Sequence, residues 1–373
     1  MIKGVIAQSV LAMLTAFSVY NVFRVNFYYI TGGYLKWLNV ILLIVTLYGL
    51  VLFFSGIALY PDEFNINTSL HYGYLQRIYL SVLPIYTFYL FSLNGYFTEK
   101  NMLYIFLIIL VLSVFIYYEK FFLVSEQMER EEVTNNIGYR FVPLIPMLGL
   151  VKMKEVWKYV FLIVIAAFIM MSMKRGAILI GTVALLMYLK HHLKTNSIKQ
   201  YVYILLLTII TLCVIYWFVV HLYETSSYFR VRINNTLEGN SSGRDSMYMS
   251  YFDFFLHHTS AFEFLFGSGA NATYLRLGNY AHNDWLEFAI NQGVLGLILY
   301  IFYWITFAHE WKNSQSKSCC KLVLGDIIII YFLKSFFSMS FDGMTIAATL
   351  CIGHCLAQAS GKPQIIRNEF QFH

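Results

Sequence analysis

Two arginines and one histidine are placed where they could bind a phosphate group and accept a proton. Arg175 lies at the start of an apolar run, and Arg244 lies in a long segment between two such runs. Arginine suits a phosphate or pyrophosphate because its guanidinium offers a fixed fork of donors and keeps its charge. His282 comes just before another apolar run, and a neutral imidazole there can accept a proton from a hydroxyl group. These residues predict an anion-binding site that contains a base.

Each of these residues taken alone has a second explanation that stays open. Arg175 could be an ordinary cation at a helix end, with its aliphatic stem in the apolar layer. Arg244 could be a solvated arginine of a loop. His282 could be a bystander next to Asn283 and Asp284, which are typical residues for the start of a helix.

Further residues close to these three are predicted to contact the substrate. Gly176 has no side chain, so a ligand or a neighbouring helix can approach the backbone closely. Asn283 would cap a helix whose N-terminal amides and dipole attract anions. Glu287 follows one turn later and could orient a partner, while Arg230 and Arg232 add positive charge to the same long segment.

The composition places these residues in a membrane protein. Of the 373 residues 59% are hydrophobic and 12% are charged, about half the charged share of a typical soluble protein. A soluble fold has too little interior to bury so much apolar surface. The net charge of +6 comes mostly from basic residues at the ends of apolar runs, so it indicates topology rather than a nucleic-acid partner.

The fold class that follows is all-α, because in lipid a spanning segment satisfies its own backbone as a helix. Residues 139–151 are ambiguous because they include Pro143 and Pro146, and they indicate a re-entrant or broken helix. We therefore expect a bundle of ten or eleven spans in a single transmembrane domain over 1–373. The predicted spans are 5–22, 37–59, 74–93, 101–118, 155–172, 176–190, 201–221, 286–308, 322–339 and 342–359.

The positions of lysine and arginine predict the orientation. The connections 190–199 and 309–321 are both basic, so we assign both to the cytoplasm. Residues 222–285 then form one long loop on the outer face, where an aromatic run over 247–256 can lie as a short helix in the interface. The turn 172–176 faces outward as well. Lys334 and Asp326 fall inside the span 322–339, which indicates polarity inside the bundle or along a substrate path.

Several short motifs, in this order, resemble those of the O-antigen polymerase and ligase superfamily of bacterial inner-membrane enzymes. They are Ser172-Met-Lys-Arg-Gly176, Ser242-Gly-Arg244, Phe266-Gly-Ser-Gly269, His282-Asn-Asp-Trp-Leu-Glu287 and Gly293-Val-Leu-Gly296. The resemblance covers about residues 155–310. Lys174 departs from it, since small or polar residues are commoner there, and we assign this lysine no separate role.

The resemblance implies a GT-C-like glycosyltransferase in the inner membrane, with its active site facing the periplasm and with no metal or cofactor. Its substrates would be a donor and an acceptor oligosaccharide, each linked to undecaprenyl pyrophosphate, beside membrane lipids. A protein that regulates chain length is a further candidate partner. The family's catalytic arginines and histidine carry over to Arg175, Arg244 and His282.

We expect a polymerase that joins repeat units of a surface polysaccharide. A ligase that transfers the finished chain to lipid A–core shares the motifs and is the nearest alternative. A flippase or transporter without enzymatic activity is the alternative from another class. It would predict charges along a central path and related halves of the chain, whereas the charges here gather in one outer loop.

Overall fold

The protein is a bundle of helices. The computed structural model describes residues 2–29, 31–58, 68–128, 133–193, 198–239, 243–314 and 318–359. Helices make up most of these residues, and no β-strand element occurs within these ranges. The predicted all-α class is therefore confirmed.

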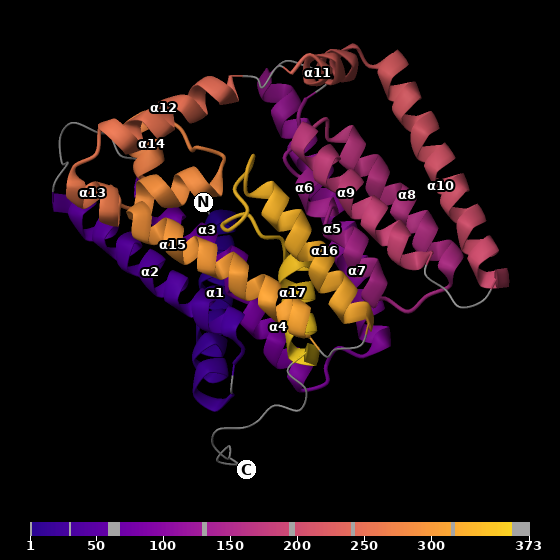
Figure 1. The fold of residues 1–373 in the computed structure, drawn as a ribbon, viewed down its shortest axis with the longest axis horizontal. Coiled ribbons are helices and arrows are strands. Elements are labelled where there is room, and N and C mark those ends of the chain that lie inside the picture. Colours follow the sequence, from indigo (N-terminus) through magenta and orange to yellow (C-terminus); the bar gives the residue numbers. More distant parts are fainter. Residues whose placement is uncertain are drawn as a thin grey trace.

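Within the described part of the chain five helices are long and apolar enough to cross a membrane, so the chain is a multi-pass membrane protein. Each coincides with one of the predicted spans, and α2 and α15 lie side by side along one flank of the bundle (Figure 1). The five are α1 (Ile2–Tyr28), α2 (Gly33–Ala58), α5 (Glu99–Met128), α10 (Ile198–Thr225) and α15 (Asp284–Asn313).

The other predicted spans correspond to shorter helices, and two of them differ from the expectation. Residues 74–93 form two helices because Pro84 begins a new one, its missing N–H suiting a first turn. Residues 335–345 form a loop, which we call the α16–α17 loop, so the last helix begins at Ile346 and not at 342. The total of ten or eleven spans stays a prediction. The shorter helices are α3 (Thr68–Val82), α4 (Pro84–Leu93), α8 (Glu155–Met171), α9 (Arg175–His192), α16 (Ser318–Lys334) and α17 (Ile346–Ala359).

The ambiguous segment 139–151 is a broken helix that runs the length of α8. It consists of α6 (Gly138–Phe141), α7 (Leu144–Met147) and the 3-10 turn η1 (Leu148–Leu150). At one end the Asn135 amide donates to the Ser172 carbonyl beyond the last residue of α8. At the other end residue 151 lies four residues before α8 begins. The segment is therefore broken, as predicted, and whether it counts as an eleventh span stays a prediction.

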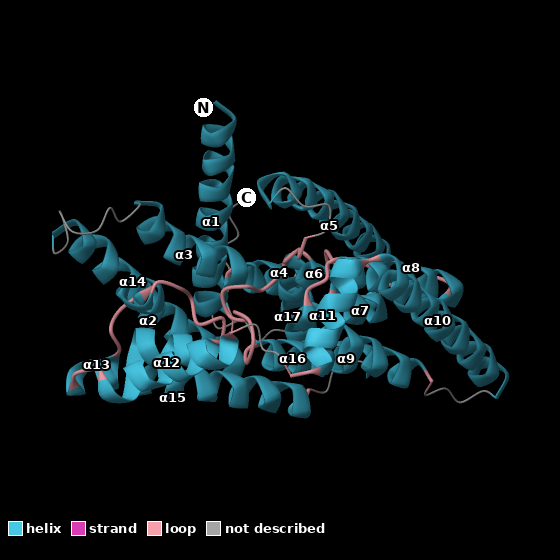
Figure 2. Cartoon of the chain, turned by 90° about the horizontal axis from the view of Figure 1, so that it is seen from above, coloured by secondary structure: helices cyan, strands magenta, loops and turns pink. Residues whose placement is uncertain are grey.

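The predicted long loop 222–285 carries four short helices, which lie along one end of the bundle at the top of Figure 1 and are seen from above in Figure 2. In α12 the rings of Tyr251 and Phe255 are buried, whereas Met249 and Phe252 are exposed. This division leaves an apolar stripe on the outside, as an interfacial helix requires. The four are α11 (Ser227–Leu237), α12 (Arg244–His257), α13 (Ala261–Phe266) and α14 (Ala272–Leu277).

Two glycine motifs let the end of this segment dock on α15. Gly293 has a φ of +71° inside α15, which breaks the helix there. The break frees the carbonyls of Ile290 and Asn291, and these accept hydrogen bonds from the amides of Ser268 (2.8 Å) and Gly269 (3.1 Å). The glycines of 266–269 and 293–296 therefore serve close backbone packing.

The start of α15 also holds the α16–α17 loop. The buried carboxylate of Asp284 accepts hydrogen bonds from the amides of Ser340 (2.9 Å) and Phe341 (3.0 Å) and from the hydroxyl of Tyr300 (2.7 Å). A buried carboxylate is stable only with such partners. Asp284 thus fixes a loop that lies more than fifty residues away in the chain.

The break at Gly293 predicts a stability difference between two glycine substitutions. In Gly293→Ala the new Cβ would lie 2.5 Å from the backbone of Gly267 and Leu265, and φ is left-handed. We expect a loss of about 1–2 kcal/mol from the backbone and a further 1–3 kcal/mol from the clash. Gly95→Ala is the control, because Gly95 has a φ of +75° but open space around it. Equal melting temperatures of the two purified variants in detergent would contradict this account.

Candidate functional site

A cavity of about 650 Å³ opens between α3, α5, α6 and α17, the turn before α9, the start of α12 and the α16–α17 loop. One of its walls is apolar and includes side chains of α5. The charged side chains of the described lining are four cations and one carboxylate, and the imidazole of His282 lies among them. These are Arg140, Lys174, Arg244, Lys334 and Asp342. Such a balance of charge favours an anionic ligand.

Arg244 reaches the cavity from the first turn of α12. Gly243 precedes it with a φ of +77°, a left-handed conformation that lets the chain turn sharply into the helix. One guanidinium nitrogen, Nη1, donates to the carbonyl of Phe337 at 2.9 Å. This bond fixes the guanidinium against the α16–α17 loop, and a second contact joins Arg244 to the hydroxyl of Tyr248.

The turn between α8 and α9 presents Lys174, and not Arg175, to the cavity. Met173 has a φ of +50°, and the Ser172 hydroxyl accepts a hydrogen bond from the Lys174 amide at 3.3 Å. Arg175 lies next to the cavity rather than in its lining. Its pKa is lowered by burial and by the charges of Arg232 and Arg244, so its guanidinium belongs to the same electrostatic cluster. Its predicted catalytic role stays a prediction.

The environment of Lys174 makes it harder for this lysine to keep its proton. Burial and the charges of Arg244 and Arg232 lower the pKa of Lys174 to about 8. Part of that shift is repulsion between like charges, which a bound anion would relieve. The arrangement is therefore suited to a ligand with several negative charges.

His282 is held in a strained conformation beside these cations. Its φ is +52°, which is rare for a residue with a side chain and costs free energy. Burial lowers its pKa from the ordinary value of 6.5, and the charges of Arg244 and Lys174 lower it further. At neutral pH the imidazole is therefore uncharged and has a nitrogen that can accept a proton.

Glu287 fixes the backbone next to His282 from outside the cavity. One carboxylate oxygen accepts from the amide of Ala281 at 2.7 Å, and the other accepts from Thr273 (2.7 Å) and Asn291 (3.0 Å). Glu287 was predicted to orient a partner, and its hydrogen bond with the Ala281 amide fixes the backbone next to His282. It does not line the cavity, so contact with a substrate there stays a prediction.

Asn283 caps α15 as expected, but this leaves no anion site at the helix end. Its side-chain oxygen accepts from the amides of Trp285 (2.9 Å) and Leu286 (3.2 Å), and its amide nitrogen donates to Phe336 (3.0 Å). The amides expected to attract an anion are occupied by the protein itself. Asn283 instead joins the start of α15 to the α16–α17 loop.

Gly176 and Arg230 are also placed outside the cavity lining. A Cβ atom at Gly176 would collide with the Tyr139 hydroxyl and the Phe337 ring. These two side chains of the protein itself therefore occupy the space next to the Gly176 backbone. The guanidinium of Arg230 donates to the carbonyls of Tyr223 (3.0 Å) and Glu224 (2.7 Å) at the end of α10. The predicted contacts of these two residues with a substrate stay predictions.

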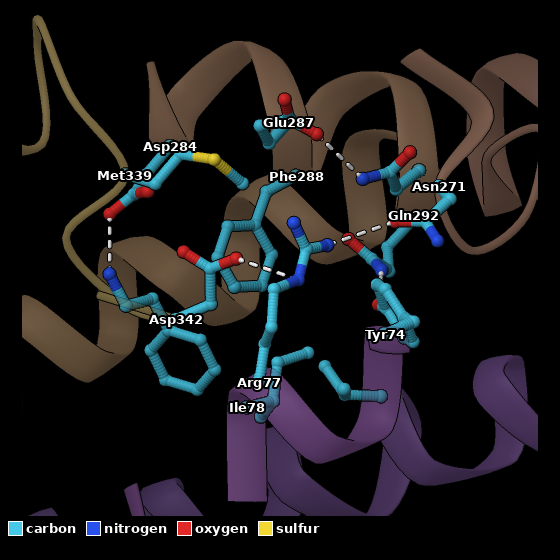
Figure 3. Close-up of a pocket in the computed structure, with 13 residues that line it drawn as sticks. Tyr74, Arg77, Ile78, Asn271, Asp284, Glu287, Phe288, Gln292, Met339 and Asp342 are labelled. Atoms are coloured by element: carbon cyan, nitrogen blue, oxygen red, sulfur yellow. Dashed lines mark hydrogen bonds and ion pairs between the residues drawn. The ribbon is translucent and has the colours of Figure 1, made fainter. Parts of the chain in front are cut away.

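Sequence reasoning did not single out Arg77, which forms a second charged group next to the cavity. In Figure 3 its guanidinium extends from α3 toward Asp342 and Asn271, with Nε 3.8 Å from Asp342 Oδ2 and Nη2 3.1 Å from Asn271 Oδ1. It also lies 4.6 Å from the centre of the Tyr280 ring. The available signal was a charged residue inside the apolar run 74–93. The same signal applies to Lys334.

The comparisons with known proteins match part of the chain to a protein family. Residues 160–301 match the model of the Wzy_C family, which is described as O-antigen ligase. Searches among curated proteins and among solved structures find no match for the chain. The matched segment includes Lys174, Arg244 and His282. It ends before Lys334 and Asp342, which line the same cavity.

The electrostatic coupling around Arg244 can be measured directly. In Arg244→Gln we expect the pKa of Lys174 and of His282 to rise, because a neighbouring positive charge is removed. Titration of isotopically labelled histidine by NMR would follow the imidazole, with His282→Gln used to assign its signal. Arg230→Gln removes the same charge from α11, and it should leave the pKa of His282 unchanged because Arg230 does not act on this imidazole. An unaltered His282 pKa in Arg244→Gln would contradict the coupling.

Proposed function

We propose that the protein is an O-antigen polymerase, because residues 160–301 match the model of a family that is described as O-antigen ligase. It joins oligosaccharide repeat units linked to undecaprenyl pyrophosphate at the periplasmic face of the inner membrane. The observation that carries the proposal is one cavity in which Lys174, Arg244 and His282 meet beside an apolar wall. A lipid-linked diphosphate sugar has the matching parts, namely an anionic group, an apolar chain and a reacting sugar.

In the proposed reaction the cations bind the donor's pyrophosphate. Lys174 and Arg244 offer several donors at the cavity, and Arg175 and Arg232 add positive charge from beside it. Negative charge grows on the pyrophosphate as it leaves, so fixed cations stabilise the transition state more than the ground state. This binding needs no metal ion or cofactor.

His282 is proposed as the base for the acceptor hydroxyl. The hydroxyl oxygen forms a bond to the anomeric carbon of the donor sugar, and the bond from that carbon to the pyrophosphate oxygen breaks. The leaving pyrophosphate takes the bonding electron pair, and the imidazole takes the hydroxyl proton. The negative donor raises the pKa of His282 toward its ordinary value, so the imidazole is a better base when the donor is bound.

Polymerase and ligase share this chemistry and differ in the acceptor. A strain that lacks the gene separates them, because loss of a polymerase leaves single repeat units on the core. Loss of a ligase leaves no O-chain at all. Complementation of that strain then provides the assay for variants.

The proposed roles predict the effect of Arg244→Ala on glycan length. Loss of this guanidinium removes a donor that stabilises the leaving group, so we expect the rate of polymerisation to fall by about 10²–10³-fold. Arg276→Ala should support normal chains, since that side chain lies outside the cavity lining and pairs with Glu263 at 2.6 Å. Gel profiles of the surface polysaccharide from strains with equal membrane levels of the two variants measure this. Long chains at wild-type abundance from Arg244→Ala would refute the proposed site.

The two shifted pKa values predict a bell-shaped dependence of kcat/KM on pH. Activity should fall on the acid side below pH 6.5, where His282 becomes protonated, because its pKa is depressed. It should fall on the alkaline side near pH 8, where Lys174 loses its proton and the free enzyme loses affinity for the anion. Purified protein with a lipid-linked donor gives the profile. Lys174→Arg should extend the alkaline side, and an unchanged alkaline side in that variant would exclude Lys174 as its source.

A further inference from the structure

Lys334, at the end of α16, is a buried cation whose charge faces the cavity. Its side chain lines the cavity although the residue is only 5% exposed. Its ammonium lies 5.3 Å from the centres of the Tyr139 and Tyr331 rings. Such a group is costly to bury and usually has a partner of opposite charge.

Among the described residues no carboxylate lies within ion-pair distance of this ammonium. The nearest candidates are engaged elsewhere, since Asp342 faces Arg77 at 3.8 Å and Asp284 accepts the amides of Ser340 and Phe341. These carboxylates still lower the cost of burying the lysine, because they act on it at longer range. They do not occupy its donors.

Among the described residues the ammonium donates one hydrogen bond. Lys334 Nζ donates to the carbonyl of Gly343 at 2.9 Å. A Cβ atom at Gly343 would lie 2.9 Å from that nitrogen, so the ammonium fits here because residue 343 has no side chain. An ammonium has three N–H donors, so two remain.

We propose that Lys334 is a further ligand of the donor's pyrophosphate, a role that rests on the proposed function. It contributes to the cavity from α16, whereas Lys174 and Arg244 come from the turn before α9 and from α12. A diphosphate has two phosphoryl groups, and cations from separate elements can bind both. Lys334 therefore gives the site its preference for a diphosphate over a monophosphate.

Binding of two short lipids to the full-length protein in detergent tests this role. The probes are geranylgeranyl pyrophosphate and geranylgeranyl monophosphate. In Lys334→Met we expect affinity for the pyrophosphate to fall by about tenfold or more, with a smaller change for the monophosphate. Lys334→Arg keeps the charge and should restore most of the preference.

Two further variants separate binding from folding. Lys152→Met is the matched control, because it removes one lysine charge that is exposed and paired with Glu99 at 2.8 Å. Lys334→Met combined with Asp342→Asn keeps the net charge of the region, so it remains folded if charge imbalance alone harms the single variant. The double variant should still lack the preference for the pyrophosphate.

The outcomes distinguish this inference from the function on which it rests. Wild-type preference in a folded Lys334→Met protein, with pyrophosphate binding lost in Arg244→Ala, would overturn the role of Lys334 and leave the proposed site standing. If the wild-type protein binds neither lipid, both the site and the inference fail. Loss of the preference in Lys334→Met and the double variant, but not in Lys152→Met, is the expected result.

Discussion

Repulsion between cations that are held around one cavity is the constraint on which the rest of the structure depends. Burial and the charges of Arg244 and Arg232 lower the pKa of Lys174, and burial and the charges of Arg244 and Lys174 lower the pKa of His282. Like charges separate unless a rigid scaffold holds them or a counter-ion joins them. The fold provides the scaffold, and the proposed donor provides the counter-ion. Two properties are linked, because the charges proposed to bind an anion also add to the effect of burial in keeping the imidazole neutral.

The scaffold depends on hydrogen bonds between side chains and the backbone of distant segments. Asp284 binds two amides of the α16–α17 loop, Asn283 binds the carbonyl of Phe336, and Arg244 binds the carbonyl of Phe337. Residues at the start of α15 and at the start of α12 therefore form hydrogen bonds with the same loop. Since the matched segment ends at residue 301 and this loop lies beyond it, the site is completed by a part of the chain outside the family match. A change in the loop would move Arg244 and the backbone near His282 together.

The sequence was informative where a physical rule acts locally. Apolar runs predicted helices because lipid leaves few alternatives, and Pro84 was a visible break within one run. Motif order predicted that Arg244 and His282 belong to one site, and both line one cavity. Which cation of the turn faces the cavity was not predictable, since Lys174 and Arg175 are adjacent and the choice depends on a φ of +50° at Met173. A charged residue in an apolar run predicted that Lys334 lies inside the bundle or along a substrate path, but its place in this cavity depends on how α16 packs.

A structure of the protein with a bound isoprenoid pyrophosphate tests the central claim most directly. The account predicts that the two phosphorus atoms lie in the cavity within hydrogen-bonding reach of Lys174, Arg244 and Lys334, with the isoprenoid chain along the apolar wall formed by α5. The His282 ring should face the sugar end of the diphosphate. Phosphorus density at another surface, with this cavity unchanged and these three cations without contact to the ligand, would contradict the account.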